Sequence, residues 1–410
     1  MSRPSDSRVA LGYPNFLFHA GARVLSVLAS EMQAVAVGWQ IYGLTHRPLD
    51  LGLVGLAQFL PGILLFLVAG HAADRFPRKR ILQTCACGFA LVSVLLFAFT
   101  IRGITAVYPI YLVLLLNGTA RAFSMPASQA MLPSLVSEAH FANAIAWGSS
   151  WFQTATIFGP VAGGLIYGAA ASPLPVYGIA AVSYLAAFFL YSRIDVKTIV
   201  RPPKAAAPEM VWEGLHYIWK NKFVLGAISL DLFAVLLGGA VALLPVYARE
   251  ILAVGATGLG ILRSAPGVGA ILTALLLAHR PLGKRQGTVM LCCVFGFGLF
   301  TVLFGVSRSV ALSLVALALT GACDMVSVVV RSTMVQLSTP DRMRGRVSAV
   351  NMVFIGASNE VGQFESGITA QWFGTVPAVV LGGIGTIVVV ALWTRLFPEL
   401  RKAPGRVAVG

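Results

Sequence analysis

Charged side chains within apolar sequence are the residues of this chain best suited to do chemistry. Nine of them lie inside long apolar stretches: Arg23, Glu31, Arg121, Asp231, Arg263, Asp324, Arg331, Glu360 and Glu365. A charge at the centre of a membrane-spanning helix costs roughly 2.5–3.5 kcal/mol on insertion scales, so such residues face a protein interior or a wet cavity. A carboxylate there can bind and release a proton, and a nearby arginine can stabilise its charged form.

The apolar stretches themselves predict an all-α membrane protein. The 410 residues are 57% hydrophobic and 11% charged, with a mean hydropathy of +0.82, whereas soluble domains carry about 25% charged residues. One helix needs about 20 mostly apolar residues to cross a bilayer. Twelve stretches qualify, at 16–44, 49–73, 81–101, 105–128, 141–169, 173–193, 223–248, 257–278, 288–306, 310–334, 347–373 and 376–397.

The basic residues predict the orientation. With both termini in the cytosol, the outer loops hold only Arg47, Arg102, Arg249 and Arg308 of the 30 Lys and Arg residues, and most of the others fall in cytosolic segments. The net charge of +15 then follows from topology and from attraction to the acidic inner leaflet. We therefore expect no nucleic-acid partner.

An internal repeat divides the chain into two halves. At an offset of 203 residues the same or similar residues recur in six pairs: Gly118 and Gly321, Ser124 and Ser327, Met131 and Met334, Glu138 and Asp341, Gly159 and Gly362, Gly164 and Gly367. Such a repeat predicts two similar helical bundles with a site between them. We expect an N-terminal bundle at 1–193, a linker at 194–222 and a C-terminal bundle at 223–410.

The end of the linker is amphipathic. Residues 209–220 place Val211, Leu215, Ile218 and Trp219 on one face of a helix, which predicts a helix lying in the cytosolic interface. An ordinary solvated connector is the alternative.

Enzyme and metal chemistry find no support in the sequence. G-x-S-x-G, H-E-x-x-H and a glycine-rich phosphate loop are all missing from it. The five cysteines fall within predicted helices, so neither disulfides nor a metal site at an aqueous face is indicated. We expect no catalytic residue, no metal and no cofactor.

The loop after the second apolar stretch resembles the signature of the major facilitator superfamily, G-x-x-x-D-R-x-G-R-K/R. The matching residues are Gly70, Asp74, Arg75, Arg78 and Lys79, with Pro77 in place of the usual glycine. The resemblance implies the major facilitator fold, twelve helices in two pseudo-symmetric six-helix bundles. It also implies a latch, in which Asp74 docks at the positive start of the eleventh helix. Arg75, Arg78 and Lys79 would hold the loop against carboxylates and lipid phosphates.

Other segments resemble the drug-and-siderophore exporter branch of this superfamily. They are GWQIYGLT, LPSLVSEAHFANA and TPDRMRGRVSAVNMVFIGASNEVGQFESG. GPVAGG is similar to the end of an exporter and antiporter motif, with Gly159, Pro160, Gly163 and Gly164 as its residues; close helix packing alone is the alternative. The fourth-helix signature R-x-x-x-G is missing, because Leu114 stands where its arginine would be.

In this superfamily, helices one, four, seven and ten line the central cavity, which implies roles for several of the charges. Glu31 is the first candidate for proton coupling, followed by Asp231 and Asp324. Arg121 and Asp324 occupy equivalent positions of the repeat, so we expect them to pair across the halves as part of a gate. Pairing of Asp324 with Arg331 within one bundle is the alternative. The expected energy source is the proton gradient.

Polar and aromatic side chains complete the expected site. The eleventh helix carries the polar cluster Asn359, Glu360, Gln363 and Glu365, which should not face lipid and for which a structural role is the alternative. The candidates for contact with substrate are Trp39, Tyr42, Phe59, Phe123 and Phe233, and ordinary packing is their alternative.

Taken together, the resemblance implies a secondary transporter that exports an amphipathic small molecule, drug-like or siderophore, in exchange for protons by alternating access. We expect it to act as a monomer among the lipids of a bacterial inner membrane. Movement of lysophospholipid between leaflets and a non-transporting receptor with the same fold are the alternatives.

Overall fold

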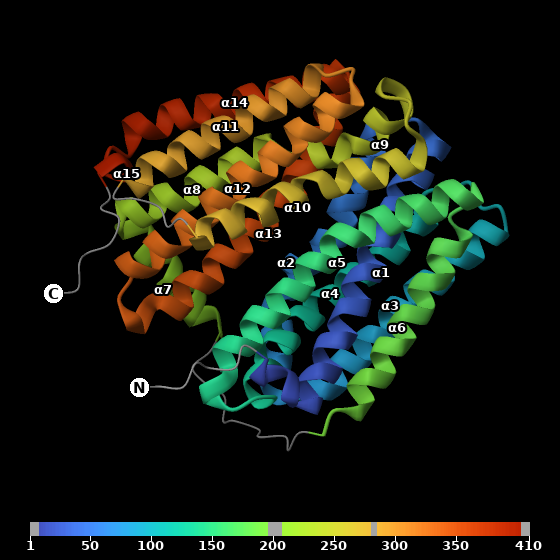
Figure 1. The fold of residues 1–410 in the computed structure, drawn as a ribbon, viewed down its shortest axis with the longest axis horizontal. Helices are drawn as coiled ribbons and strands as arrows, with labels where there is room; N and C mark the ends of the chain where they lie inside the picture. Colours follow the sequence, from blue (N-terminus) through green and yellow to red (C-terminus); the bar gives the residue numbers. More distant parts are fainter. Residues whose placement is uncertain (1–7, 196–206, 280–284, 403–410) are drawn as a thin grey trace. The chain divides into compact units, whose positions relative to one another are not determined.

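The computed structural model describes residues 8–195, 207–279 and 285–402, and within these ranges every regular element is a helix. Figure 1 shows the helices. The first seven long ones are α1 (Pro14–Thr45), α2 (Pro48–Arg75), α3 (Arg78–Ile101), α4 (Tyr108–Met131), α5 (Phe141–Ala170), α6 (Leu174–Arg193) and α7 (Ala207–Lys220). The others are α8 (Lys222–Leu237), α9 (Leu244–Val246), α10 (Gly255–His279), α11 (Gln286–Val306), α12 (Val310–Ser338), α13 (Asp341–Phe373), α14 (Thr375–Leu396) and α15 (Glu399–Lys402).

Helices occupy all twelve predicted apolar stretches, and each is one long helix except in the stretch at 223–248. Nine helical segments of the described residues are both long and apolar enough to cross a membrane. The other three stretches correspond to α4, α5 and α13, which have 24, 30 and 33 residues and therefore also exceed the length of about 20 residues that a span needs.

Contacts divide the chain into two compact units. Unit 1 comprises residues 1–44 and 57–207, and unit 2 comprises residues 45–56 and 208–410. Within unit 1, α3 packs on α4 and α6; within unit 2, α12 packs on α10 and α11, and α14 packs on α11 and α8 (Figure 1). The division from the sequence assigned residues 45–56 to the N-terminal bundle, whereas their contacts group them with unit 2.

The stretch predicted as one helix at 223–248 is interrupted. α8 ends at Leu237, and a 3-10 turn (Ala240–Leu243), the short α9 and a π-helical turn (Tyr247–Ile251) follow. Gly238 and Gly239 lie at the break, and a Cβ atom added at Gly239 would come within 2.8 Å of the carbonyl oxygen of Gly362 on α13. Interrupted helices of this kind often mark a hinge or a strained position.

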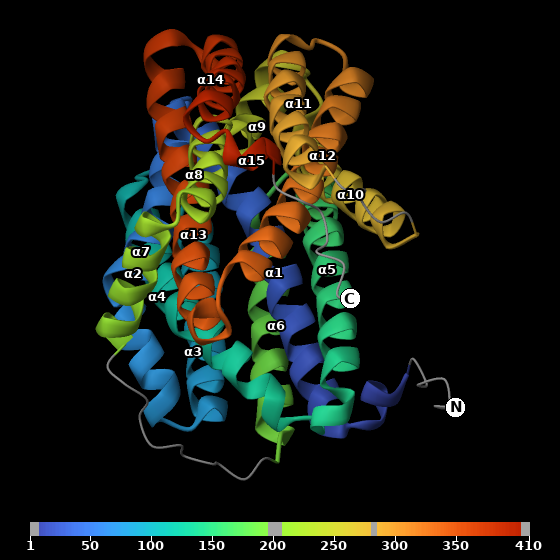
Figure 2. The same cartoon turned by 90° about the vertical axis from the view of Figure 1, so that its left-hand side faces the viewer.

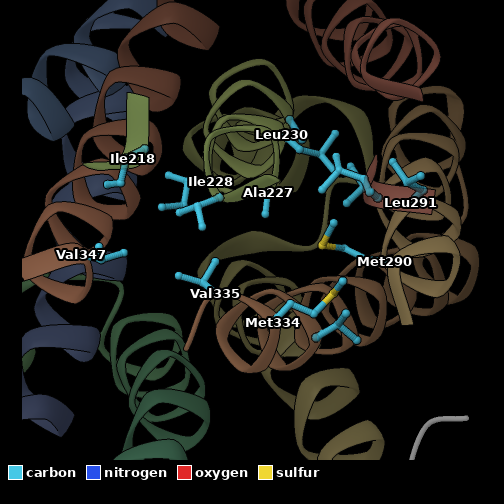
Figure 3. Close-up of a cluster of buried hydrophobic side chains, with 14 of the residues drawn as sticks. Ile218, Ala227, Ile228, Leu230, Met290, Leu291, Met334, Val335 and Val347 are labelled. Carbon is cyan, nitrogen blue, oxygen red and sulfur yellow. The ribbon is translucent and has the colours of Figure 1, made fainter. Parts of the chain in front are cut away.

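The helix α7 packs on unit 2 through one face. Ile218 is 1% exposed and joins a buried cluster with Ala227 and Ile228 of α8 and Val347 of α13, which Figure 3 shows. Glu213 of α7 forms an ion pair with Arg346 of α13, and Figure 2 shows the two helices side by side. These contacts make α7 part of unit 2.

The residues of the predicted apolar face of α7 differ in exposure. Leu215 and Ile218 pack on the cluster, but Trp219 is 71% exposed, as is Trp212 one heptad before it. The side chain of Val211 lies outside the described residues. Exposed tryptophans are typical of a membrane–water interface, so the outer face of α7 carries the interfacial residues.

Candidate functional site

The glycines of the GPVAGG motif bring α5 against α1 at Glu31. Gly159, Pro160, Gly163 and Gly164 are all buried. A Cβ atom added at Gly159 would lie 2.5 Å from Cβ of Glu31, and one at Gly163 would lie 2.7 Å from Cα of Met32. Small residues allow such close approach between membrane helices. The first proton-coupling candidate and the exporter-like motif thus meet at one helix crossing.

Tyr184 of α6 lies close to this crossing. Its ring is 2% exposed, and its hydroxyl interacts with Ser30 and lies within electrostatic range of both Glu31 and Arg121. Glu31 is half-buried, whereas Arg121 on α4 is exposed. Unit 1 therefore presents an acid and a base of opposite charge around one buried phenol.

A polar network that the sequence reasoning missed joins α1 to α3 and α6. Ser93 donates to Oε1 of Gln33 at 2.6 Å, and Tyr177 donates to Oε1 of Gln40 at 2.6 Å. The amide of Gln40 also donates to Thr100 at 3.1 Å. Polar residues recur every seven residues along α1, at His19, Ser26, Gln33 and Gln40. This period is the sequence feature that could have predicted the network.

In unit 2, Arg331 pairs with Asp231. The two side chains form an ion pair between α12 and α8, and they are 2% and 7% exposed. The alternative in which Arg331 pairs with Asp324 is wrong, because its partner is the carboxylate of Asp231. The other prediction, that Arg121 pairs with Asp324, joins residues of the two units and stays a prediction.

Asp324 lies beside this ion pair. It lines a cavity of about 10 Å³ together with Asp231, Ser327 and Cys323, and a volume of this size holds about one water molecule. No basic group lies within 4.0 Å of Asp324 in the described part of the chain. The three charged residues of this site therefore carry one surplus negative charge when both acids are ionised.

The polar cluster of α13 lies against the first turns of α2. Gln363 donates to Oε2 of Glu360 at 3.1 Å, and a Cβ atom added at Gly55 would lie 3.3 Å from the side chain of Gln363 and 3.5 Å from Glu360. This contact was not predicted from the sequence, although the spacing of Gly52 and Gly55 was a signal for it.

The other members of the α13 cluster have partners within their own helix. Asn359 donates to the carbonyl of Ile355 at 2.8 Å, and Glu365 accepts from Thr369 at 2.7 Å. Gly367, on the same helix, lies against Gly52 of α2.

The basic residues of the loop between α2 and α3 bind helix ends. Nη1 of Arg78 donates to the carbonyl of Ala130 at 2.7 Å, and Nζ of Lys79 donates to the carbonyls of Ser192 and Ile194 at 2.9 and 2.7 Å. The last carbonyls of a helix have no partner within it and carry partial negative charge. Arg78 and Lys79 thus bind carbonyls in unit 1, and their contact with lipid phosphates stays a prediction. Asp74 and Arg75 are exposed.

The aromatic candidates for substrate contact are packed to different degrees. Trp39 lies edge-on to Tyr167 with ring centroids 6.5 Å apart, and Phe233 lies 5.3 Å from the Trp393 ring. Tyr42 is 3% exposed, and Phe59 and Phe123 are half-buried. Their role as a substrate cavity stays a prediction.

Comparison with known proteins decides the family. Residues 15–404 match the transmembrane secretion effector family. The chain belongs to this family of major facilitator transporters. It is 26% identical to the enterobactin exporter EntS of Shigella boydii serotype 4 (strain Sb227) over 388 residues, which cover 93% of this chain and 91% of that protein. The predicted resemblance to the siderophore exporter branch is thereby confirmed.

Solved structures show the same fold. A bacterial homologue of the human lysosomal transporter Spinster, inward-facing and occupied, aligns with a TM-score of 0.73 at 14% identity over 99% of this chain and all of that one. The nucleoside transporter NupG aligns with a TM-score of 0.72 at 14% identity over 93% and 99% of the two chains. These structures show the fold, whereas the family match and the curated relatives show that the protein is a membrane transporter of small molecules and not an enzyme.

Proposed function

We propose that the protein exports an amphipathic small molecule, a siderophore or a drug-like compound, in exchange for protons. The exporter among its relatives supports the direction and the kind of cargo. In this proposal the chain lies in a bacterial inner membrane with both termini in the cytosol, and it works by alternating access.

The position of Asp324 is the observation that carries proton coupling. Its carboxyl lies by a water-sized cavity next to the Asp231–Arg331 pair, and Arg331 is already neutralised by Asp231. An enclosed, uncompensated charge is costly, so Asp324 binds a proton while it is enclosed and releases it when water reaches it. Glu31, held at the crossing of α1 and α5, is the second candidate.

Transport in liposomes tests the proposal. Purified protein is reconstituted, a pH gradient is imposed, and the flux of enterobactin, ethidium and lysophosphatidylcholine is measured with and without an uncoupler. We expect flux of enterobactin or ethidium that needs the gradient. Flux of lysophosphatidylcholine alone would instead establish the lipid alternative.

Variants separate coupling from binding. Asp324→Asn is expected to abolish gradient-driven flux and to keep binding of the same cargo, because the amide preserves the shape and loses the titration. Glu138→Gln, at an exposed position in the loop after α4, is the matched control and should transport like the wild type. Undiminished gradient-driven flux in Asp324→Asn would remove this residue from the mechanism, and Glu31→Gln would then be tested in the same way.

A further inference from the structure

A second cavity is lined entirely by residues of unit 1. It has a volume of about 300 Å³ and is lined by the first turns of α1, the end of α4 and the first half of α5. Its walls are mainly apolar and aromatic, with Phe16, Val24, Leu132, Ile145, Trp151 and Phe152 among them. The Phe16 and Trp151 rings stack with centroids 6.0 Å apart, so this wall is a pre-formed aromatic surface.

Two nitrogen bases line this apolar cavity. The guanidinium carbon of Arg23 lies 4.9 Å from the centroid of the Phe152 ring, and no carboxylate lies within 4.0 Å of Arg23 in the described ranges. His19 is 3% exposed. Its Nε2 lies 3.3 Å from the hydroxyl of Ser128, and its Nδ1 has no hydrogen-bond partner among the described residues. The cavity thus offers a cation that has no carboxylate partner among the described residues.

We propose that this cavity binds a single-ring aromatic carboxylate. The planar guanidinium of Arg23 matches the two oxygens of a carboxylate, and neutralising it offsets the cost of a charge at membrane depth. The aromatic walls take the ring, because offset and edge-on ring contacts are favourable.

The volume sets the size of the ligand. A cavity of about 300 Å³ exceeds the roughly 150 Å³ of a cavity that binds benzene, so it has room for one benzene ring with its carboxylate. A larger cargo would place one ring here. As the recognition site for exported cargo this inference rests on the proposed function, whereas as a binding site it does not.

Benzoate is the probe. Its dissociation constant is measured by isothermal titration calorimetry with the full-length protein in detergent and without any gradient. Benzylamine and benzyl alcohol, which keep the ring and lose the negative charge, should bind at least about tenfold more weakly, the loss typical of a missing charge-assisted hydrogen bond. Equal affinity for benzoate and benzyl alcohol would overturn the proposal.

Two variants alter the cavity in different ways. Arg23→Gln removes the cation and should weaken benzoate binding at least about tenfold. Gly148→Leu fills the cavity it lines, and because a Cβ atom added at this glycine meets nothing within 4 Å, the variant should fold and lose benzoate binding. Arg102→Gln, an exposed arginine at the end of α3, is the matched control and should bind like the wild type. Wild-type affinity in both cavity variants would overturn the site.

The two proposals fail in different ways. Benzoate binding with the expected pattern in the variants, together with no export of any cargo from liposomes, would refute the proposed function and leave the binding site standing. Export by Gly148→Leu at the wild-type rate would refute the role of this cavity in cargo recognition.

Discussion

At the scale of single residues, the charges within the membrane are stabilised in different ways. Asp231 and Arg331 neutralise each other in a buried pair. Arg23 lies over the ring of Phe152 without a carboxylate partner among the described residues. A charge that is already paired serves structure, whereas a charge next to a cavity can respond to a proton or a ligand. Asp231 and Asp324 line the same small cavity, so the ion pair with Arg331 is what separates Asp231 from Asp324, although the sequence ranked them together.

Asp231→Asn is expected to destabilise the protein far more than Asp341→Asn. Removing the carboxylate of Asp231 leaves Arg331 as an uncompensated buried charge, which costs about 3–5 kcal/mol. Asp341 pairs with Arg344 at 2.7 Å, but both side chains are exposed, and such a pair contributes about 0–1 kcal/mol. Denaturation in detergent, followed by tryptophan fluorescence, measures the two losses.

The double variant Asp231→Leu with Arg331→Met provides the control for this pair. Replacing both partners by apolar residues of similar volume often restores stability, so the double variant should be more stable than Asp231→Asn. A double variant that is as unstable as the single one would show that the ion pair does more than neutralise its own charges.

At the scale of helices, glycines determine where the elements touch. Apolar side chains gain little from leaving lipid for another helix, so packing of small residues carries helix association in a membrane. Gly163 permits the contact of α5 with α1, and Gly52 permits that of α2 with α13, where an added Cβ atom would come 3.1 Å from Cα of Phe364. Both contacts lie beside acidic side chains, Glu31 and Glu360, and therefore fix the surroundings of those carboxyls.

Gly163→Ala and Gly148→Ala, the same substitution in one helix, should change stability in opposite directions. A Cβ atom at Gly163 meets backbone atoms of Met32 at 2.7 Å, which cannot rotate away, whereas one at Gly148 meets nothing within 4 Å. Alanine favours a helix over glycine by about 1 kcal/mol, so Gly148→Ala should be neutral or more stable and Gly163→Ala less stable. Thermal unfolding in detergent measures the difference. Equal melting temperatures would show that α5 does not bear on α1 at this glycine.

At the scale of the whole molecule, hydropathy alone predicted the class of fold and the number of long helices. Each membrane-spanning helix must be apolar over about 20 residues whatever surrounds it, so the sequence of each segment is enough to predict that helix. The break after Leu237 was missed because a hydropathy window records apolarity and not backbone geometry. The pairing of Arg331 with Asp231 was not predicted because it depends on a contact between distant segments.

Orientation is the remaining property of the whole molecule that the basic residues predict, and labelling of single cysteines tests it. In a variant with the five native cysteines replaced by serine, cysteines are introduced at the exposed positions Thr105, Ala139, Ser309 and Arg342. With both termini in the cytosol, Thr105→Cys and Ser309→Cys lie outside and should react with a membrane-impermeant maleimide in intact cells. Ala139→Cys and Arg342→Cys should react only after permeabilisation, since positively charged loops are retained in the cytosol. The reverse pattern would place both termini outside and contradict the predicted topology. Labelling of Thr105→Cys and Ala139→Cys from the same side, or of Ser309→Cys and Arg342→Cys from the same side, would contradict the single span that we predict between the two positions.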